Sequence, residues 1–130
     1  MSDVRPVDRP LICFVDDEPS ILASLSAAIR SRGDFDVSTF DRAAAFLAFG
    51  LAASTRCLVT DHKMPGMDGR HLIAEVRRRG WSFPVIVNSG FSEASIRPRF
   101  AGLNIAAFVE KSTGSAVLMT TILKLVQPLV

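Results

Sequence analysis

Four short apolar runs recur along the chain, and each is nearly continuous instead of alternating with polar residues. The runs are Leu11–Val15, Cys57–Val59, Val85–Val87 and Ile105–Val109. This pattern is typical of strands that are covered on both faces in a parallel sheet. A fifth segment, Phe35–Phe40, alternates between apolar and polar residues, so we expect it to be an edge strand.

Between these runs, apolar residues recur at the three- and four-residue spacing of amphipathic helices. We expect the first helix to begin at Pro19, which suits the first turn, and to end before Gly33. We expect a second helix over residues 43–49, with Asp41 as its N-cap and Gly50 closing it.

The second half of the chain contains two further helix patterns. One includes residues 72–76 and ends in Arg77–Arg79, which suit the negative end of a helix dipole better than a nucleic-acid patch. The other covers residues 117–126, and we expect it to stop at Pro128.

Between these two patterns the helical signal is weak. Pro98 lies in the middle of Ser92–Asn104, and a proline inside a helix costs about 3 kcal/mol unless it occupies the first turn. We therefore expect a short or broken fourth helix that begins near Pro98. The alternation of strands and helices predicts an α/β fold, with a five-stranded parallel, doubly wound sheet, right-handed crossovers and five helices.

Composition narrows the class of protein. The chain has 130 residues, of which 48% are hydrophobic and 22% charged, enough for one domain with its own core. We interpret residues 1–9 as a flexible N-terminal arm and residues 10–130 as the domain. The formal charge of +2 argues against nucleic acid as a direct partner. No apolar stretch predicts a membrane span or a signal peptide. Cys13 and Cys57 each lie within an apolar run, as reduced core residues do. We therefore expect a cytoplasmic protein.

Polar side chains follow the apolar runs at the points where the strands end. Asp16-Asp17-Glu18 follows the first run, Asp61 the next buried run, Ser89 the following one and Lys111 the last. The carboxyl ends of parallel strands form one edge of the sheet, so we expect these side chains to converge there. Clustered carboxylates without His or Cys favour Mg²⁺, and a hydroxyl and an ammonium beside that ion suit a phosphoryl group.

With these residues in place, the chain resembles the receiver domains of two-component response regulators, over about residues 10–127. The resemblance depends on four segments in the expected order and spacing: LICFVDDEPSI, CLVTDHKMPGMDG, VIVNSGF and AAFVEK. It implies a flavodoxin-like sheet with the strand order 2-1-3-4-5. The sequence around Asp61 most resembles the nitrogen-fixation-type branch of the family, whose receivers usually precede a DNA-binding domain. Because the chain stops after the last expected helix, a single-domain protein is mildly favoured over an excised receiver.

The resemblance implies a role for each residue at the predicted edge. Asp61 matches the phosphoacceptor. Asp16 and Asp17 match the Mg²⁺-binding pair, which Asp61 and the backbone carbonyl of Lys63 would complete. The implied phosphoryl donor is a histidine kinase or phosphotransfer protein, and the output is an interaction with another protein.

Further positions would bind the phosphoryl group or respond to it. Ser89 matches the switch hydroxyl, Lys111 the phosphate-binding lysine, and Phe108 the switch aromatic residue. Phe91 and Lys63 flank the acceptor, where an apolar ring could exclude water and a cation could hold the phosphoryl group. We therefore expect slow hydrolysis of the aspartyl phosphate.

The chain departs from the usual receiver pattern in several places. Lys111 is followed by Ser112 instead of proline, so we expect a trans peptide bond there. Asn104 stands where receivers commonly have a glycine, and Asn is the next-best residue for the left-handed conformation that this implies. Pro98 either disrupts the face that receivers use for dimerisation, giving a monomer or a weak phosphorylation-dependent dimer, or occupies a first turn and leaves that face normal. We interpret His62 and His71 as packing or surface residues.

Two other functions remain open at this stage. A Mg²⁺-dependent aspartyl phosphatase generally needs a second Asp two residues after its nucleophile, and Lys63 stands there instead. A degenerate receiver would bind proteins constitutively without accepting phosphate, which the complete acidic and phosphate-binding set argues against. We expect a phosphoacceptor that assists its own phosphorylation and dephosphorylation but is not an enzyme for a free metabolite.

Overall fold

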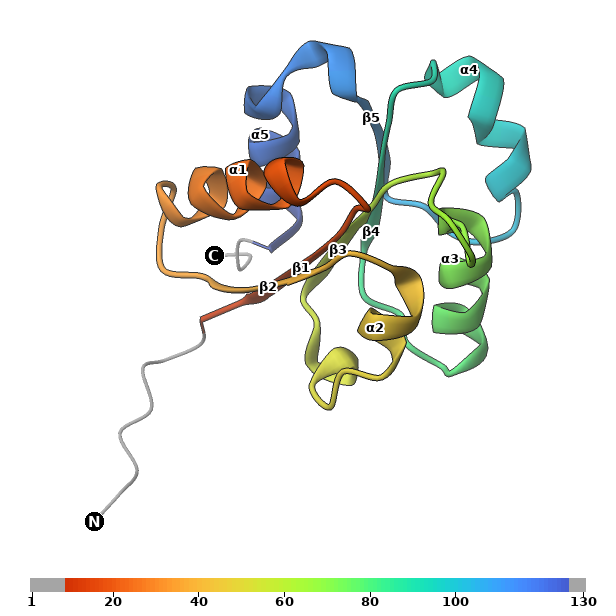
Figure 1. The fold of residues 1–130 in the computed structure, drawn as a ribbon, viewed down its shortest axis with the longest axis horizontal. Helices are drawn as coiled ribbons and strands as arrows, with labels where there is room; N and C mark the ends of the chain where they lie inside the picture. Colours follow the sequence, from red (N-terminus) through yellow and green to blue (C-terminus); the bar gives the residue numbers. More distant parts are fainter. Residues whose placement is uncertain (1–8, 127–130) are drawn as a thin grey trace.

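The strands form one parallel sheet in the order β2-β1-β3-β4-β5, seen nearly edge-on in Figure 1. A computed structural model describes residues 9–126. The strands are β1 (Leu11–Val15), β2 (Asp36–Phe40), β3 (Cys57–Thr60), β4 (Val85–Ser89) and β5 (Ala107–Glu110). The predicted five-stranded sheet and its order are confirmed, and β2 lies at an edge as expected. The last strand begins and ends slightly later than the apolar run Ile105–Val109 suggests.

Helices cover both faces of the sheet. The α-helices are α1 (Pro19–Arg30), α2 (Ala43–Leu47), α3 (Gly69–Arg78), α4 (Glu93–Ile96) and α5 (Ser115–Val126). Three 3₁₀ turns accompany them: η1 (Ala52–Ser54), η2 (Arg97–Phe100) and η3 (Lys111–Thr113). α1 and α5 lie on one face, and α2, α3 and α4 on the other (Figure 1). The arm predicted for residues 1–9, apart from Arg9, and the predicted stop at Pro128 lie outside the described residues.

Each face of the sheet has its own apolar core, because successive strand residues point to opposite sides. On the side of α1 and α5, Phe14 and Ile86 pack with Leu118. On the other side, Val15 and Leu58 pack with residues of α3 that include Ile73. All of these side chains are fully buried or nearly so. The buried strands therefore fix the positions of the polar residues that follow them.

The fourth helix is short, as predicted, but its predicted start is wrong. α4 begins at Glu93 instead of near Pro98, because Ser92 caps it: the Ser92 hydroxyl accepts a hydrogen bond from the Ser95 amide. Pro98 lies in η2, which continues the chain directly after α4. Pro98 occupies the first turn of η2, where the amide hydrogen that proline lacks has no partner within the helix.

The second helix is also shorter than the sequence predicts. α2 ends at Leu47, before Gly50, and the predicted capping by Asp41 is wrong. Arg42 occupies the N-cap position, and no side chain caps the helix. Five residues form little more than one turn, so packing of Phe46 in the core stabilises this segment more than its termini do.

The arginines that end α3 have more specific partners than the helix dipole alone. The Arg77 guanidinium donates hydrogen bonds of 2.8–3.0 Å to four backbone carbonyls, those of Trp81, Phe83, Leu103 and Asn104. It thereby joins the connection that leads into β4 to the one that leads into β5. Asn104 has φ = +57°, which confirms the left-handed conformation predicted for it.

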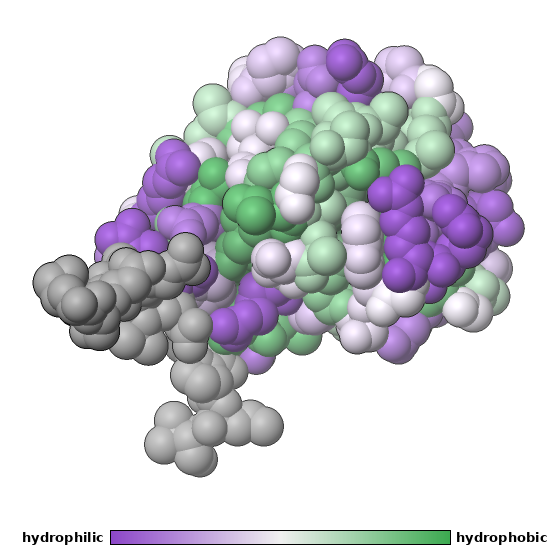
Figure 2. Space-filling model, turned by 90° about the horizontal axis from the view of Figure 1, so that it is seen from below, coloured by the Kyte–Doolittle hydropathy of each residue, from purple (hydrophilic) through white to green (hydrophobic). Residues whose placement is uncertain are grey.

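The amino ends of the strands form a different surface from the carboxyl ends. Figure 2 shows this end of the molecule, where hydrophobic residues gather in the middle of the face and hydrophilic residues flank them. Leu51, between α2 and η1, is 57% exposed. Within residues 9–126, no helix has the length and apolarity that crossing a membrane would require.

Candidate functional site

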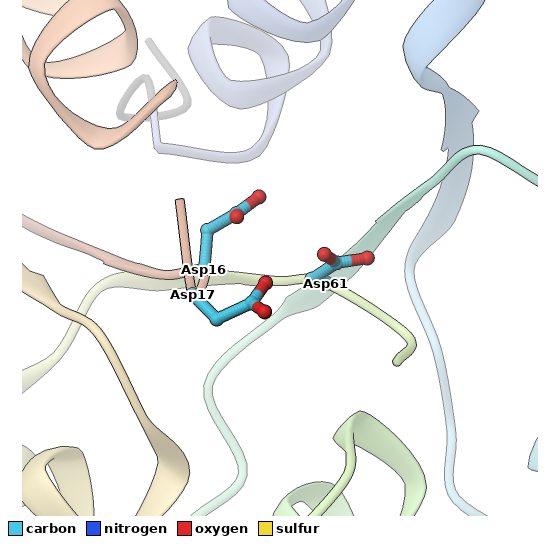
Figure 3. A group of neighbouring side chains, drawn as sticks. All are labelled: Asp16, Asp17 and Asp61. Atoms are coloured by element: carbon cyan, nitrogen blue, oxygen red, sulfur yellow. The ribbon is translucent and has the colours of Figure 1, made fainter. Parts of the chain in front are cut away.

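Three carboxylates meet at the carboxyl ends of β1 and β3. Asp16 and Asp17 follow β1, and Asp61 follows β3, the neighbouring strand (Figure 3). One oxygen from each lies within 4.8 Å of the others. The Asp61 amide donates a hydrogen bond to the Val15 carbonyl, so strand pairing continues up to the acidic cluster. The predicted convergence of Asp16, Asp17 and Asp61 is therefore present in the structure.

The Lys111 ammonium lies between two of these carboxylates. Its Nζ is 3.0 Å from Asp16 Oδ2 and 2.9 Å from Asp61 Oδ2. Lys111 begins η3 directly after β5, and its peptide bond to Ser112 is trans, as predicted. The positive charge of Lys111 therefore compensates part of the negative charge of the acidic cluster.

Burial changes the protonation of these groups. It raises the pKa of Asp61 above the ordinary value, and the hydrogen bond from Lys111 opposes part of that rise. Burial works against the charge on Lys111, yet its hydrogen bonds to Asp61 and Asp16 leave its pKa above the ordinary value. The Lys111 ammonium and the Asp61 carboxylate therefore stabilise each other's charged form.

The donor atoms of the cluster fit a hard divalent cation. All are carboxylate oxygens, and no His or Cys joins the group among residues 9–126. Mg²⁺ prefers oxygen ligands of this type and keeps part of its water shell. The site can therefore hold a metal ion through Asp16, Asp17 and Asp61. The ligand role of the Lys63 carbonyl stays a prediction.

Ser89 ends β4 beside the cluster and is 1% exposed. Its hydroxyl oxygen accepts a 3.0 Å hydrogen bond from the Phe91 amide. The Phe91 ring is 46% exposed, and Lys63 Nζ lies 5.2 Å from its centroid, close enough for a cation–π interaction. The two residues predicted to modulate the site thus contact each other at its rim.

The backbone of α3 approaches the acceptor closely at Gly69. A Cβ atom at this position would overlap the Asp61 carbonyl oxygen. The Gly69 amide donates a 2.9 Å hydrogen bond to the His62 carbonyl, and Asp68 caps the helix by accepting one from the His71 amide. Glycine is therefore required where the helix begins, and His71 is a surface residue, as expected.

Sequence reasoning did not single out Asn88, which lies one residue before Ser89. Asn88 is 6% exposed and lines a cavity of about 130 Å³ between α1 and α5, together with Lys111. A polar residue between the apolar run Val85–Val87 and Ser89 was the available signal. This cavity gives the Lys111 side chain room to change position.

His62 and Phe100 are the other residues near the site whose roles the sequence left unspecific. His62 is 4% exposed, and its ring packs between the rings of Phe91 and Phe100. Phe100 in turn contacts Phe108. No local pattern indicates this arrangement, because the partners come from the segments that follow β3 and β4, from η2 and from β5.

Comparison with known proteins identifies the family. The model of the response regulator receiver domain matches residues 12–123. The chain is 32% identical to the transcriptional regulatory protein FixJ of Azorhizobium caulinodans over 108 residues, which are 83% of this chain and 51% of FixJ. It is 30% identical to TdiR of Thauera aromatica over 111 residues, 85% of this chain and 48% of TdiR. It therefore spans about half the length of these curated relatives.

Solved structures agree with this assignment. The crystal structure of FixJ-N superposes with a TM-score of 0.79 at 28% identity, covering 95% of this chain and 98% of that one. The structure of the response regulator StyR gives a TM-score of 0.81 at 28% identity, covering 92% of this chain and 60% of that one. The chain belongs to the response regulator receiver domains of two-component systems.

Proposed function

We propose that Asp61 accepts a phosphoryl group from a histidine kinase or a phosphotransfer protein, with Mg²⁺ bound by Asp16, Asp17, Asp61 and the Lys63 carbonyl. The observation that carries this proposal is the position of the Lys111 ammonium, 2.9 Å from the Asp61 carboxylate and 3.0 Å from Asp16. A carboxylate that is held beside a cation and a metal-binding pair has the surroundings that phosphoryl transfer requires.

In the transfer, one Asp61 carboxylate oxygen attacks phosphorus, and an O–P bond forms. The N–P bond of the donor phosphohistidine breaks, and its electron pair stays on the imidazole nitrogen, which becomes protonated. Mg²⁺ supplies positive charge to the phosphoryl oxygens when it is bound. Lys111 leaves Asp16 and pairs with a second phosphoryl oxygen, and the Ser89 hydroxyl donates to a third.

The domain works as a switch and does not turn over a free metabolite. When Ser89 turns toward the phosphoryl group, its hydrogen bond from Phe91 is lost, and Phe108 reorients. The changed surface alters affinity for a downstream protein. The exposed ring of Phe91 and the ammonium of Lys63, which contact each other, would exclude water from the acceptor and slow hydrolysis.

The test is phosphorylation of the intact chain by acetyl phosphate and Mg²⁺, followed by intact-mass measurement. We expect a mass gain of one phosphoryl group, which chelation of Mg²⁺ abolishes. Asp61→Asn removes the gain, whereas the control Asp68→Asn keeps it, because asparagine still caps α3. A wild-type chain without a mass gain, or an Asp61→Asn variant that retains it, would refute the proposal.

A further inference from the structure

Four aromatic side chains form a continuous row from the rim of the site to the face made by α4 and β5. The centroid distances are 5.8 Å for Phe91–His62, 5.4 Å for His62–Phe100 and 5.7 Å for Phe100–Phe108. All three contacts are edge-to-face, with interplanar angles of 67–71°. Such pairs are favourable beyond their buried area, and each constrains the orientation of the next ring. We call Phe91, His62, Phe100 and Phe108 the aromatic row.

Two members of the aromatic row are hydrogen-bonded to the reacting groups through their backbones. The His62 amide donates a 2.7 Å hydrogen bond to Asp61 Oδ1. The Phe91 amide donates a 3.0 Å hydrogen bond to the Ser89 hydroxyl. A change in the hydrogen bonding of the acceptor or of the switch hydroxyl therefore acts on neighbouring rings of one row.

The other end of the aromatic row reaches α4. The Arg97 guanidinium lies 4.9 Å from the Phe108 centroid, in cation–π contact, and it forms an ion pair with Glu93 one turn earlier. Arg97, Phe100 and Phe108 line a cavity of about 200 Å³. The last two rings thus have open space beside them, which rings packed on all sides would lack.

His62 is an unusual residue for its surroundings. Its ring is almost completely buried, and Nδ1 has no hydrogen-bond partner among the described residues. An unpaired buried nitrogen disfavours folding, so hydrogen bonding by the ring does not explain the residue. What the ring does provide is its flat shape between Phe91 and Phe100.

We propose that His62 is a positioning residue that couples phosphorylation of Asp61 to the conformation of α4 and η2, acting through its contact with Phe100. This inference rests on the proposed function. A response of Phe108 is expected from the family, and the structure adds a connection through His62 and Phe100. When Ser89 releases the Phe91 amide, Phe91 moves, His62 shifts against Phe100, and the packing of Arg97 on Phe108 changes. Close-packed rings transmit such shifts because they have few alternative arrangements.

The experiment compares hydrogen exchange over residues 93–100 with and without Mg²⁺ and fluoroberyllate, a phosphoryl mimic. We expect loading to change exchange in this segment by at least about fivefold in the wild-type chain, the lower end of ordinary allosteric coupling. His62→Ala removes the central ring and should reduce the change to less than about twofold. His62→Phe keeps a flat ring and should retain the response. Phe100→Leu interrupts the same row if His62→Ala does not fold.

A matched control separates coupling from stability. Phe46→Leu also shortens a fully buried aromatic residue, but Phe46 packs against Phe40, Trp81 and Phe83, outside the aromatic row. This variant should lose stability and keep the response of residues 93–100. Loading is measured independently in every variant by the Asp61-dependent mass gain with acetyl phosphate.

The outcomes distinguish the two proposals. A full response in loaded His62→Ala and Phe100→Leu, or a response that Phe46→Leu abolishes equally, would overturn the inference and leave the phosphoacceptor role intact. An absence of any response in the loaded wild-type chain would do the same. Failure of the wild-type chain to become phosphorylated would overturn the proposed function, and the inference with it.

Discussion

Replacing Lys111 with methionine tests how the acidic cluster is stabilised. The substitution keeps a long apolar side chain but removes the only ammonium that contacts both Asp16 and Asp61 among the described residues. The side chains of Asp16 and Asp61 are 4% and 11% exposed, and that of Lys111 is 24% exposed. The variant therefore leaves two nearly buried carboxylates facing each other without a cation.

The expected cost follows from these exposures. Removing one partner of a buried ion pair costs about 3–5 kcal/mol, and the partial exposure of Lys111 reduces this to about 2–3 kcal/mol. An unfolding entropy of about 2.1 cal/mol/K per residue then gives a decrease in Tm of roughly 7–11 °C for a domain of this length. The measurement is thermal unfolding by circular dichroism in Mg²⁺-free buffer. Lys124→Met, at an exposed position of α5, is the control.

Mg²⁺ and pH provide independent checks on the same reasoning. If Mg²⁺ binds as proposed, it competes with Lys111 for the carboxylates in the wild-type chain, so the rise in Tm on adding Mg²⁺ should be larger in Lys111→Met. Burial raises the folded-state pKa of Asp61, so its contribution to stability is present at low pH and is lost as pH rises through that pKa. Without Lys111 the folded-state pKa of Asp61 should rise further, so the loss begins at the same unfolded-state pKa but extends to a higher pH. A Tm within about 2 °C of the wild type, smaller than any shift that the ion pair predicts, would refute the reasoning.

Three further predictions concern residues around the site. Arg77→Met removes four hydrogen bonds to backbone carbonyls and should lower the free energy of unfolding by about 2–4 kcal/mol, measured by urea denaturation. A loss below about 1 kcal/mol would contradict a stabilising role for these hydrogen bonds. Gly69→Ala should slow phosphorylation by acetyl phosphate by about tenfold to a hundredfold, because it displaces the acceptor backbone, whereas Gly50→Ala should not. Burial raises the pKa of Cys13 to about 11 and of Cys57 to about 12. At pH 8 about one thiol in a thousand or fewer is then ionised, so a thiol reagent should label the chain only after unfolding, and rapid native labelling would disprove the burial.

The predictable part of the site was the part attached to the strands. Near-continuous apolar runs identify buried parallel strands, and the one or two residues after each run must lie at the same edge of the sheet. Asp16, Asp61, Ser89 and Lys111 could therefore be brought together from sequence alone. The trans bond after Lys111 followed from local backbone preferences, and the left-handed Asn104 followed from the glycine that receivers commonly have at that position.

The features that could not be predicted depend on contacts between distant segments. The fourth helix begins at Glu93 because Ser92 caps it, a signal that the proline six residues later obscured. His62 and Phe100 contact each other across a separation that leaves no periodic pattern in the sequence. Arg77 binds carbonyls of two connections, which helix-dipole reasoning does not identify. Side-chain packing, unlike strand order, needs the assembled structure.

The contacts of Lys111 also govern how the site responds to incomplete folding. Lys111 is 95 residues from Asp16 and 50 from Asp61 along the chain, so the cluster obtains its cation only when β5 joins the sheet. A partly folded form without β5 would keep the three carboxylates but lack the contacts that Lys111 makes with two of them. A ligand that binds the finished site stabilises the whole domain by mass action instead of one segment. If the site binds Mg²⁺ as proposed, metal affinity would report on cooperative folding, and a fragment that ends before β5 would misreport it.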